Sequence, residues 1–220
     1  MNEETVFIPT EIDLTAFISQ EAHDLKSPFN RILGFTKMVL KGMDGPLTDL
    51  QREDLTTVYE NSQQALAFIG NLVDMARLSR GEKNPEIQPC TLQHVFSRAL
   101  ETWRSTFPEG RIALENNLPP EDCTLQADAN LLAQAYQHML FYVATWIRKP
   151  GRMSVQAACA EGRLRLRITG YGEKDIAAPQ MELTMWSFVA GRILTLHGGA
   201  LHGTIEAGKS ITLEANLPTA

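Results

Sequence analysis

Apolar residues in the first eighty positions recur at steps of three and four, the spacing of a helix that buries one face. In residues 18–39 and again in residues 55–78 this rhythm predicts two long helices. The repeating positions are Ile18, Ala22, Leu25, Phe29, Ile32 and Val39, then Leu55, Val58, Ser62, Ala65, Ile69, Leu72 and Ala76. Glycines and a proline in residues 41–46 end the first helix, and Thr48 or Asp49 can cap the second.

Two helices of this length joined by a short turn form a hairpin that cannot bury its whole apolar seam. A second copy of the hairpin would complete a four-helix bundle. We therefore expect a homodimer that forms through the helical hairpin.

The pattern changes after residue 82, where short alternating segments predict strands and longer amphipathic segments predict helices. Segment 90–103 is expected to be a strand entry followed by a helix, and segments 128–147 and 188–197 are expected to be helices. The expected strands are 111–118, 124–127, 154–158, 164–168, 204–206 and 211–215. This order predicts an α+β chain: a helical hairpin over residues 1–82, then an α/β sandwich over residues 83–220 with helices on one face of a mixed sheet.

Composition and charge narrow the class of protein. The formal net charge of -6 argues against nucleic acid or an anionic membrane as the partner. No run of about 18 apolar residues predicts membrane insertion, and the acidic first residues do not resemble a signal peptide. The three cysteines, Cys90, Cys123 and Cys159, form no CxxC pair and are odd in number. We therefore expect a cytoplasmic protein with reduced thiols.

The candidate chemistry lies on the first helix. His23 follows the seam position Ala22 by one residue, which rotates it roughly 100° away from the seam and should leave it exposed. A neutral imidazole is a nucleophile near pH 7, because its ordinary pKa is about 6.5. The carboxylate of Asp24 can accept a hydrogen bond from one ring nitrogen, which leaves the other lone pair free to attack phosphorus. The alternative is a surface histidine without a task.

Residues 17–29, F-I-S-Q-E-A-H-D-L-K-S-P-F, strongly resemble the H-box of bacterial sensor histidine kinases. The resemblance continues through G-P-L at residues 45–47 and N-L-V-D-M-A-R-L-S at residues 71–79. It implies the dimerisation and histidine-phosphotransfer domain of two-component systems, with His23 as the phosphoacceptor. Ser27 stands where the family places a residue that positions water for dephosphorylating a partner.

The same resemblance implies response-regulator receiver domains as partners, which would dock on the face of the hairpin that carries His23. The candidate partner-binding residues are Lys26, Asn30, Arg31 and Gly34 of the first helix and Glu60 and Gln63 of the second.

The second domain resembles the histidine-kinase type of ATPase domain, on R-I-L-T-L-H-G-G at residues 192–199 and G-K-S-I-T-L at residues 208–213. Three ligand-contacting segments depart from the family pattern. His138 and Tyr142 replace two asparagines, of which the second helps to hold Mg²⁺, Ile168 replaces the aspartate that contacts adenine, and Trp186 stands in the glycine-rich turn. The lid between Gly172 and the segment from Thr184 is also short, at about eleven residues.

These departures predict that ATP binding is lost and that the chain holds no cofactor and no metal. We expect Tyr142, Trp146, Trp186 and Phe188 to fill the emptied pocket, and His138, His197 and His202 to be structural. The resulting hypothesis is a dimeric protein that carries phosphate on His23 between receiver domains. The alternatives are an active ATP-dependent sensor kinase and a pseudokinase scaffold that transfers no phosphate.

Overall fold

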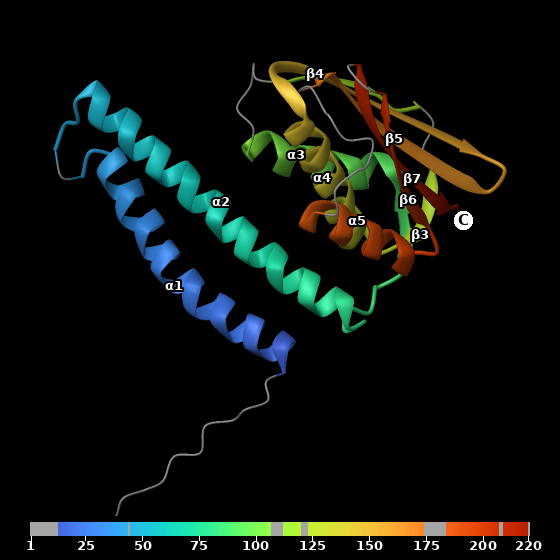
Figure 1. The fold of residues 1–220 in the computed structure, drawn as a ribbon, viewed down its shortest axis with the longest axis horizontal. Helices are drawn as coiled ribbons and strands as arrows, with labels where there is room; N and C mark the ends of the chain where they lie inside the picture. Colours follow the sequence, from blue (N-terminus) through green and yellow to red (C-terminus); the bar gives the residue numbers. More distant parts are fainter. Residues whose placement is uncertain are drawn as a thin grey trace, which may run out of the picture. The chain divides into compact units, whose positions relative to one another are not determined.

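The computed structural model describes residues 13–43, 45–106, 112–119, 123–173, 184–206 and 209–219. The chain divides into two compact units, residues 1–80 and residues 81–220. Figure 1 shows a helical hairpin in the first unit and a layer of helices on a sheet in the second. The α+β class predicted from the sequence is confirmed.

The first unit consists of α1 (Leu14–Leu40) and α2 (Asp49–Ser79). Asp13 caps α1 by accepting from the backbone N–H groups of the first turn, and Thr48 forms a capping box with Gln51 at the start of α2. Helix α1 continues through Pro28. It ends just before Gly42, whose φ of 76° lies in the left-handed region that glycine adopts without a steric penalty.

The hairpin buries only part of the predicted apolar stripe. Ala22 of α1 and Ile69 and Ala76 of α2 are buried, whereas Leu25 and Ile32 are 50% and 41% exposed. As the sequence predicted, the hairpin does not bury its whole apolar seam, because the apolar residues cover an arc of α1 wider than one helix partner can bury. A second apolar face is left in solvent within the single chain. We call it the outer stripe: Leu14, Phe17, Leu25, Ile32 and Phe35.

The second unit contains a mixed five-stranded sheet in the order β2-β4-β5-β7-β6. The strands are β2 (Ile112–Asn117), β4 (Ile147–Ala160), β5 (Arg163–Glu173), β6 (Ala200–Glu206) and β7 (Ser210–Pro218). The pair β2–β4 is parallel and the other pairs are antiparallel. A separate antiparallel pair joins β1 (Gln88–Thr91) to β3 (Thr124–Ala127).

Three helices, α3 (Leu92–Thr106), α4 (Ala129–Trp146) and α5 (Met185–Leu196), lie on one face of this sheet, as the sequence predicted (Figure 1). The central strand shows why. In β5 the residues Leu164, Leu166 and Ile168 are fully buried, whereas the arginines that alternate with them are exposed. Helix α4 contacts α3, α5 and the sheet, so its side chains are buried on nearly every side.

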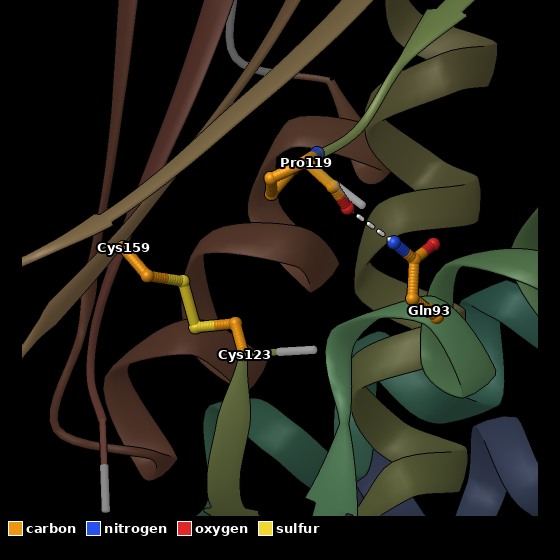
Figure 2. Close-up of a disulfide and its surroundings, with 4 residues drawn as sticks. All are labelled: Gln93, Pro119, Cys123 and Cys159. Atoms are coloured by element: carbon orange, nitrogen blue, oxygen red, sulfur yellow. Dashed lines mark hydrogen bonds between the residues drawn. A yellow bond between two sulfur atoms is a disulfide. The ribbon is translucent and has the colours of Figure 1, made fainter. Parts of the chain in front are cut away.

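A disulfide between Cys123 and Cys159 corrects the expectation that all thiols are reduced. The two residues are 36 positions apart, and their Cα atoms are 6.3 Å apart. Figure 2 shows the bond between the start of β3 and the end of β4. The prediction failed because it considered only local cysteine spacing, whereas strand placement brings these two together. Cys90 lies outside the disulfide.

Within the described residues, no helix is both long and apolar enough to cross a membrane.

Candidate functional site

His23 stands fully in solvent on α1. Its side chain is 86% exposed and that of Asp24 is 66% exposed, so the predicted exposure of His23 is confirmed. The Nδ1 atom of His23 lies 3.2 Å from Oδ1 of Asp24. When Nδ1 carries the proton it donates to this carboxylate, and Nε2 then keeps a free lone pair. The two side chains thus have the arrangement that a nucleophilic imidazole requires.

The other candidate residues of α1 share the His23 face to different degrees. Gly34, Asn30 and Ser27 lie within about 40° of His23 around the helix axis, whereas Lys26 and Arg31 lie about 60° and 80° away. All of these positions are exposed except Lys26, which is half-buried. The structure therefore places Ser27, Asn30 and Gly34 together with His23, and Lys26 and Arg31 at the two borders of that face.

The outer stripe lies on the opposite side of α1 from His23. Leu14 and Ile32 are each nine residues from His23, which corresponds to two and a half helical turns. A partner that covers the outer stripe would leave the imidazole accessible.

The register of the hairpin sets which residues of α2 lie level with His23. Nη1 of Arg52 donates to the carbonyl of Leu40, and Arg80 pairs with Asp13 at the other end of the hairpin. This antiparallel register places His23 level with Ile69. Glu60 and Gln63 are exposed but lie about 10 Å further along the axis, level with the segment 30–33.

Phe68 of α2 is adjacent to Ile69 and is 55% exposed. It is level with His23 along the hairpin, but a residue one position before the seam of α2 lies on the opposite face of an antiparallel pair from a residue one position after the seam of α1. Phe68 therefore extends the apolar side of the hairpin that carries the outer stripe.

In the second unit, the positions that would contact a nucleotide are packed with protein. His138 is 1% exposed, and Tyr142 and Ile168 are fully buried. The ring of Tyr142 lies 5.9 Å from that of Trp146. An isoleucine without polar side-chain atoms cannot accept a hydrogen bond from an amino group. This side-chain set does not fit Mg²⁺-ATP.

Trp186 at the start of α5 closes the same region. Its ring is stacked on Phe141, with centroids 5.1 Å apart, and lies 5.1 Å from the ring of His138. The first turn of α5 is also capped by its own side chains: Thr184 Oγ1 accepts from the N–H of Ser187, and Ser187 Oγ accepts from the N–H of Thr184. These backbone donors are therefore not available to a phosphate group. The predicted short lid lies outside the described residues.

Two features that match the family have packing roles here. A Cβ atom on Gly170 would lie 2.6 Å from Cγ2 of Ile147 in β4 and 2.7 Å from Cγ1 of Val143 in α4, so these two side chains leave no room for one at this position. His197 is buried, with Nδ1 2.8 Å from the carbonyl of Ile193, and its Nε2 accepts from the N–H of Asp128 at 3.0 Å. The expectation that His197 is structural is confirmed.

Asp128 caps α4, and its carboxylate accepts from the backbone N–H groups of Glu86, Asn130 and Leu131. Partial burial opposes its ionisation, but the backbone N–H groups of Leu131, Glu86 and Asn130 and the nearby His197 outweigh this effect, so the pKa of Asp128 lies below its ordinary value. Asp128 also lines a surface cavity of about 460 Å³ together with Glu86, Cys90 and His94. Among the described residues, no group of histidine, cysteine and acidic side chains could hold a metal ion.

Comparisons with known proteins agree with this architecture. Residues 13–81 match the family model of the His Kinase A (phospho-acceptor) domain. The non-motile and phage-resistance protein of Caulobacter vibrioides is 23% identical over 92% of this chain and 27% of its own length. Histidine protein kinase DivJ of the same organism is 22% identical over 71% of this chain and 26% of its own length. The chain thus spans about a quarter of the length of these relatives.

Solved structures share the fold at low sequence identity. Full-length ShkA in complex with AMPPNP superposes with a TM-score of 0.69 at 19% identity, over 94% of this chain and 46% of that one. Acinetobacter baumannii histidine kinase AdeS gives a TM-score of 0.60 at 11% identity, over 89% of this chain and 97% of that one. Residues 13–81 thus match the phospho-acceptor domain model, and the chain as a whole shares its fold with solved histidine kinase structures.

Proposed function

We propose that this chain is a dimeric histidine phosphotransfer protein of two-component signalling, which carries a phosphoryl group on His23 between response-regulator receiver domains and no longer binds ATP. The observation that supports it best is the contrast between an exposed, carboxylate-paired imidazole and a packed nucleotide region.

The proposed transfer is a displacement at phosphorus between two side chains. Nε2 of His23 attacks the phosphorus of an aspartyl phosphate, the new N–P bond forms, and the P–O bond to the aspartyl carboxylate breaks. Asp24 keeps the proton on Nδ1 and stabilises the positive charge that the ring gains. Attack by the aspartate of a second receiver on the same phosphorus reverses the step and frees the imidazole.

Magnitudes support the loss of ATP binding. A hydrogen bond to a charged group contributes about 1.5–3 kcal/mol, and a millimolar-to-micromolar site requires about 4–8 kcal/mol in total. Replacing the adenine-contacting carboxylate, the Mg²⁺-holding amide and the glycine-rich turn removes a sum of this size. Gly170 supports no nucleotide role, because packing against Ile147 and Val143 accounts for it.

Dimerisation is part of the proposal. The outer stripe is apolar and exposed within one chain, and its place opposite His23 would let two hairpins pair while both imidazoles stay accessible. Receiver domains would dock on the His23 face, where Ser27, Asn30 and Gly34 lie, with Glu60 and Gln63 as contacts from α2. Lys26 and Arg31 would border this contact.

The deciding experiment compares two phosphate sources. The protein is incubated with labelled ATP and, separately, with a panel of labelled phosphorylated receiver domains, and acid-labile, base-stable label on His23 is quantified. We expect label from at least one receiver and none from ATP. Label from ATP alone would support an active kinase instead, and label from neither source would support a scaffold.

For Ser27 we propose a role in positioning water during dephosphorylation of a partner, since its hydroxyl lies one turn from His23. Decay of a phosphorylated receiver is measured with the native protein and with Ser27→Ala. The variant should slow the decay, and equal decay rates would exclude the role.

A further inference from the structure

The Cys123–Cys159 disulfide is asymmetric in its exposure. Cys123 is 6% exposed, whereas Cys159 lies at an exposed position near the end of β4, just before the turn at residues 161–162. Of the two residues, Cys159 is therefore the more accessible to an incoming thiol. Exposed disulfides exchange with thiols far more readily than buried structural ones.

The segment that carries Cys123 has other attachments to the unit. Nε2 of Gln93 donates to the carbonyl of Pro119 at 2.6 Å, as Figure 2 shows. The carbonyl of Cys123 itself accepts from the N–H of Leu92 at 2.9 Å, and residues 124–127 pair with β1. Breaking the S–S bond would leave these contacts in place, so the unit has the means to stay folded in the reduced state.

We propose that Cys159 and Cys123 form a reversible thiol–disulfide exchange site, in which a low-molecular-weight thiol of the glutathione class attacks Sγ of Cys159. This inference is independent of the proposed role of His23.

The exchange balances with two thiol molecules. The thiolate sulfur of the first forms a bond to Sγ of Cys159, the Cys123–Cys159 bond breaks, and Cys123 leaves as a thiolate that takes a proton from solvent. A second thiol attacks the small-molecule sulfur of the mixed disulfide and releases Cys159 as a thiol. The protein disulfide gains two electrons, and the two small thiols are oxidised to one disulfide.

The third cysteine supplies an internal control. Burial, and then the negative charge of Asp128, raise the pKa of the Cys90 thiol, which lowers its thiolate fraction. Cys90 should therefore react slowly with the same reagents, and Cys90→Ala should not change the exchange.

The first test uses the unmutated protein. It is equilibrated in glutathione buffers of graded potential, quenched by alkylation under native conditions, and mapped by peptide mass spectrometry. We expect the Cys123–Cys159 linkage in oxidising buffer, two free thiols in reducing buffer, and glutathione on Cys159 in between. Free thiols at every potential, a linkage that resists reduction throughout, or glutathione mainly on Cys123 or Cys90 would overturn the proposal.

The second test separates the two sulfurs. With oxidised glutathione, Cys123→Ser should acquire one glutathionyl group on Cys159 at least about tenfold faster than Cys159→Ser acquires one on Cys123. Circular dichroism checks that each variant is folded. Equal rates in folded variants would contradict the assignment.

A third readout is stability. Opening a loop of this length should lower the unfolding temperature of the second unit by about 10 °C while leaving it folded at 25 °C. If reduction unfolds the unit at 25 °C, the bond is a structural link and not an exchange site.

Discussion

The catalytic candidates that match the family pattern are exposed in the first unit of this chain, whereas matching residues of the second unit, Gly170 and His197, are buried. In the hairpin, the motif residues His23, Asp24 and Ser27 stand in solvent, and no packing requirement explains them. In the second unit, the family-like Gly170 and His197 are explained by packing and hydrogen bonding inside the fold, while the ligand positions hold Tyr142 and Ile168. A family motif whose residues have no packing role is stronger evidence for a catalytic or binding function than a motif whose residues are needed to fill the core.

Removing the imidazole should have the largest effect. We expect His23→Gln to reduce phosphoryl transfer from a phosphorylated receiver at least about a thousandfold, because no other nucleophile stands at that position. Thermal unfolding should be unchanged, since the side chain is exposed. The matched control is His202→Gln, which alters an exposed histidine of β6 in the other unit and should leave transfer intact. An equal loss of phosphoryl transfer in both variants would contradict the assignment of His23 as the phosphoacceptor.

Placing a charge on the outer stripe should have the next largest effect. Ile32→Glu would bury a carboxylate in the proposed dimer contact, which should weaken dimerisation by about a hundredfold in Kd. Sedimentation over a concentration series measures it. Asn30→Asp introduces a charge two residues away on the His23 face and should leave the dimer unchanged. A wild-type chain that stays monomeric at tens of micromolar would contradict the dimer.

Two glycine substitutions test whether packing constrains the second unit but not the exposed face of the hairpin. Gly170→Ala should destabilise the second unit by about 1–3 kcal/mol, because the new Cβ would overlap Ile147 and Val143. Gly34→Ala should stabilise the hairpin by about 0.5–1 kcal/mol, since nothing lies within 4 Å of its Cβ position and alanine favours a helix. Urea unfolding of each variant gives both values. A neutral Gly170→Ala would show that packing does not account for that glycine.

The smallest expected effect concerns the cap of α4. Asp128→Ala should cost about 1 kcal/mol at pH 7, because two backbone N–H groups of the first turn lose their acceptor. The pKa of Asp128 is lowered in the folded state, so its ionisation contributes stability above the ordinary pKa. That contribution is lost as the pH falls through the lowered pKa.

The variant Asp128→Asn isolates this pH dependence, since it can still cap the helix but does not titrate. The stability difference between native protein and Asp128→Asn should shrink as the pH falls below about 4. A difference that stays constant down to pH 2 would contradict the assignment.

Much of the architecture follows from local pattern. The helices of the hairpin, the order of strands and helices and the exposure of His23 depend on residue spacing, which sequence alone reveals. The detail of the hairpin does not. Leu25 and Ala22 belong to one apolar stripe, yet only Ala22 is buried, because one helix partner covers a narrow arc of that stripe.

By itself, the sequence determined that this chain folds as a hairpin followed by a sandwich and presents one histidine beside a carboxylate. Periodicity and motifs depend on residues that are close together in the sequence, so they can be recognised without a structure. Only the tertiary structure decided that Trp186 stacks on Phe141 and that Cys123 reaches Cys159. Those contacts join residues far apart in sequence, and only the packing of whole elements against one another sets which of them meet.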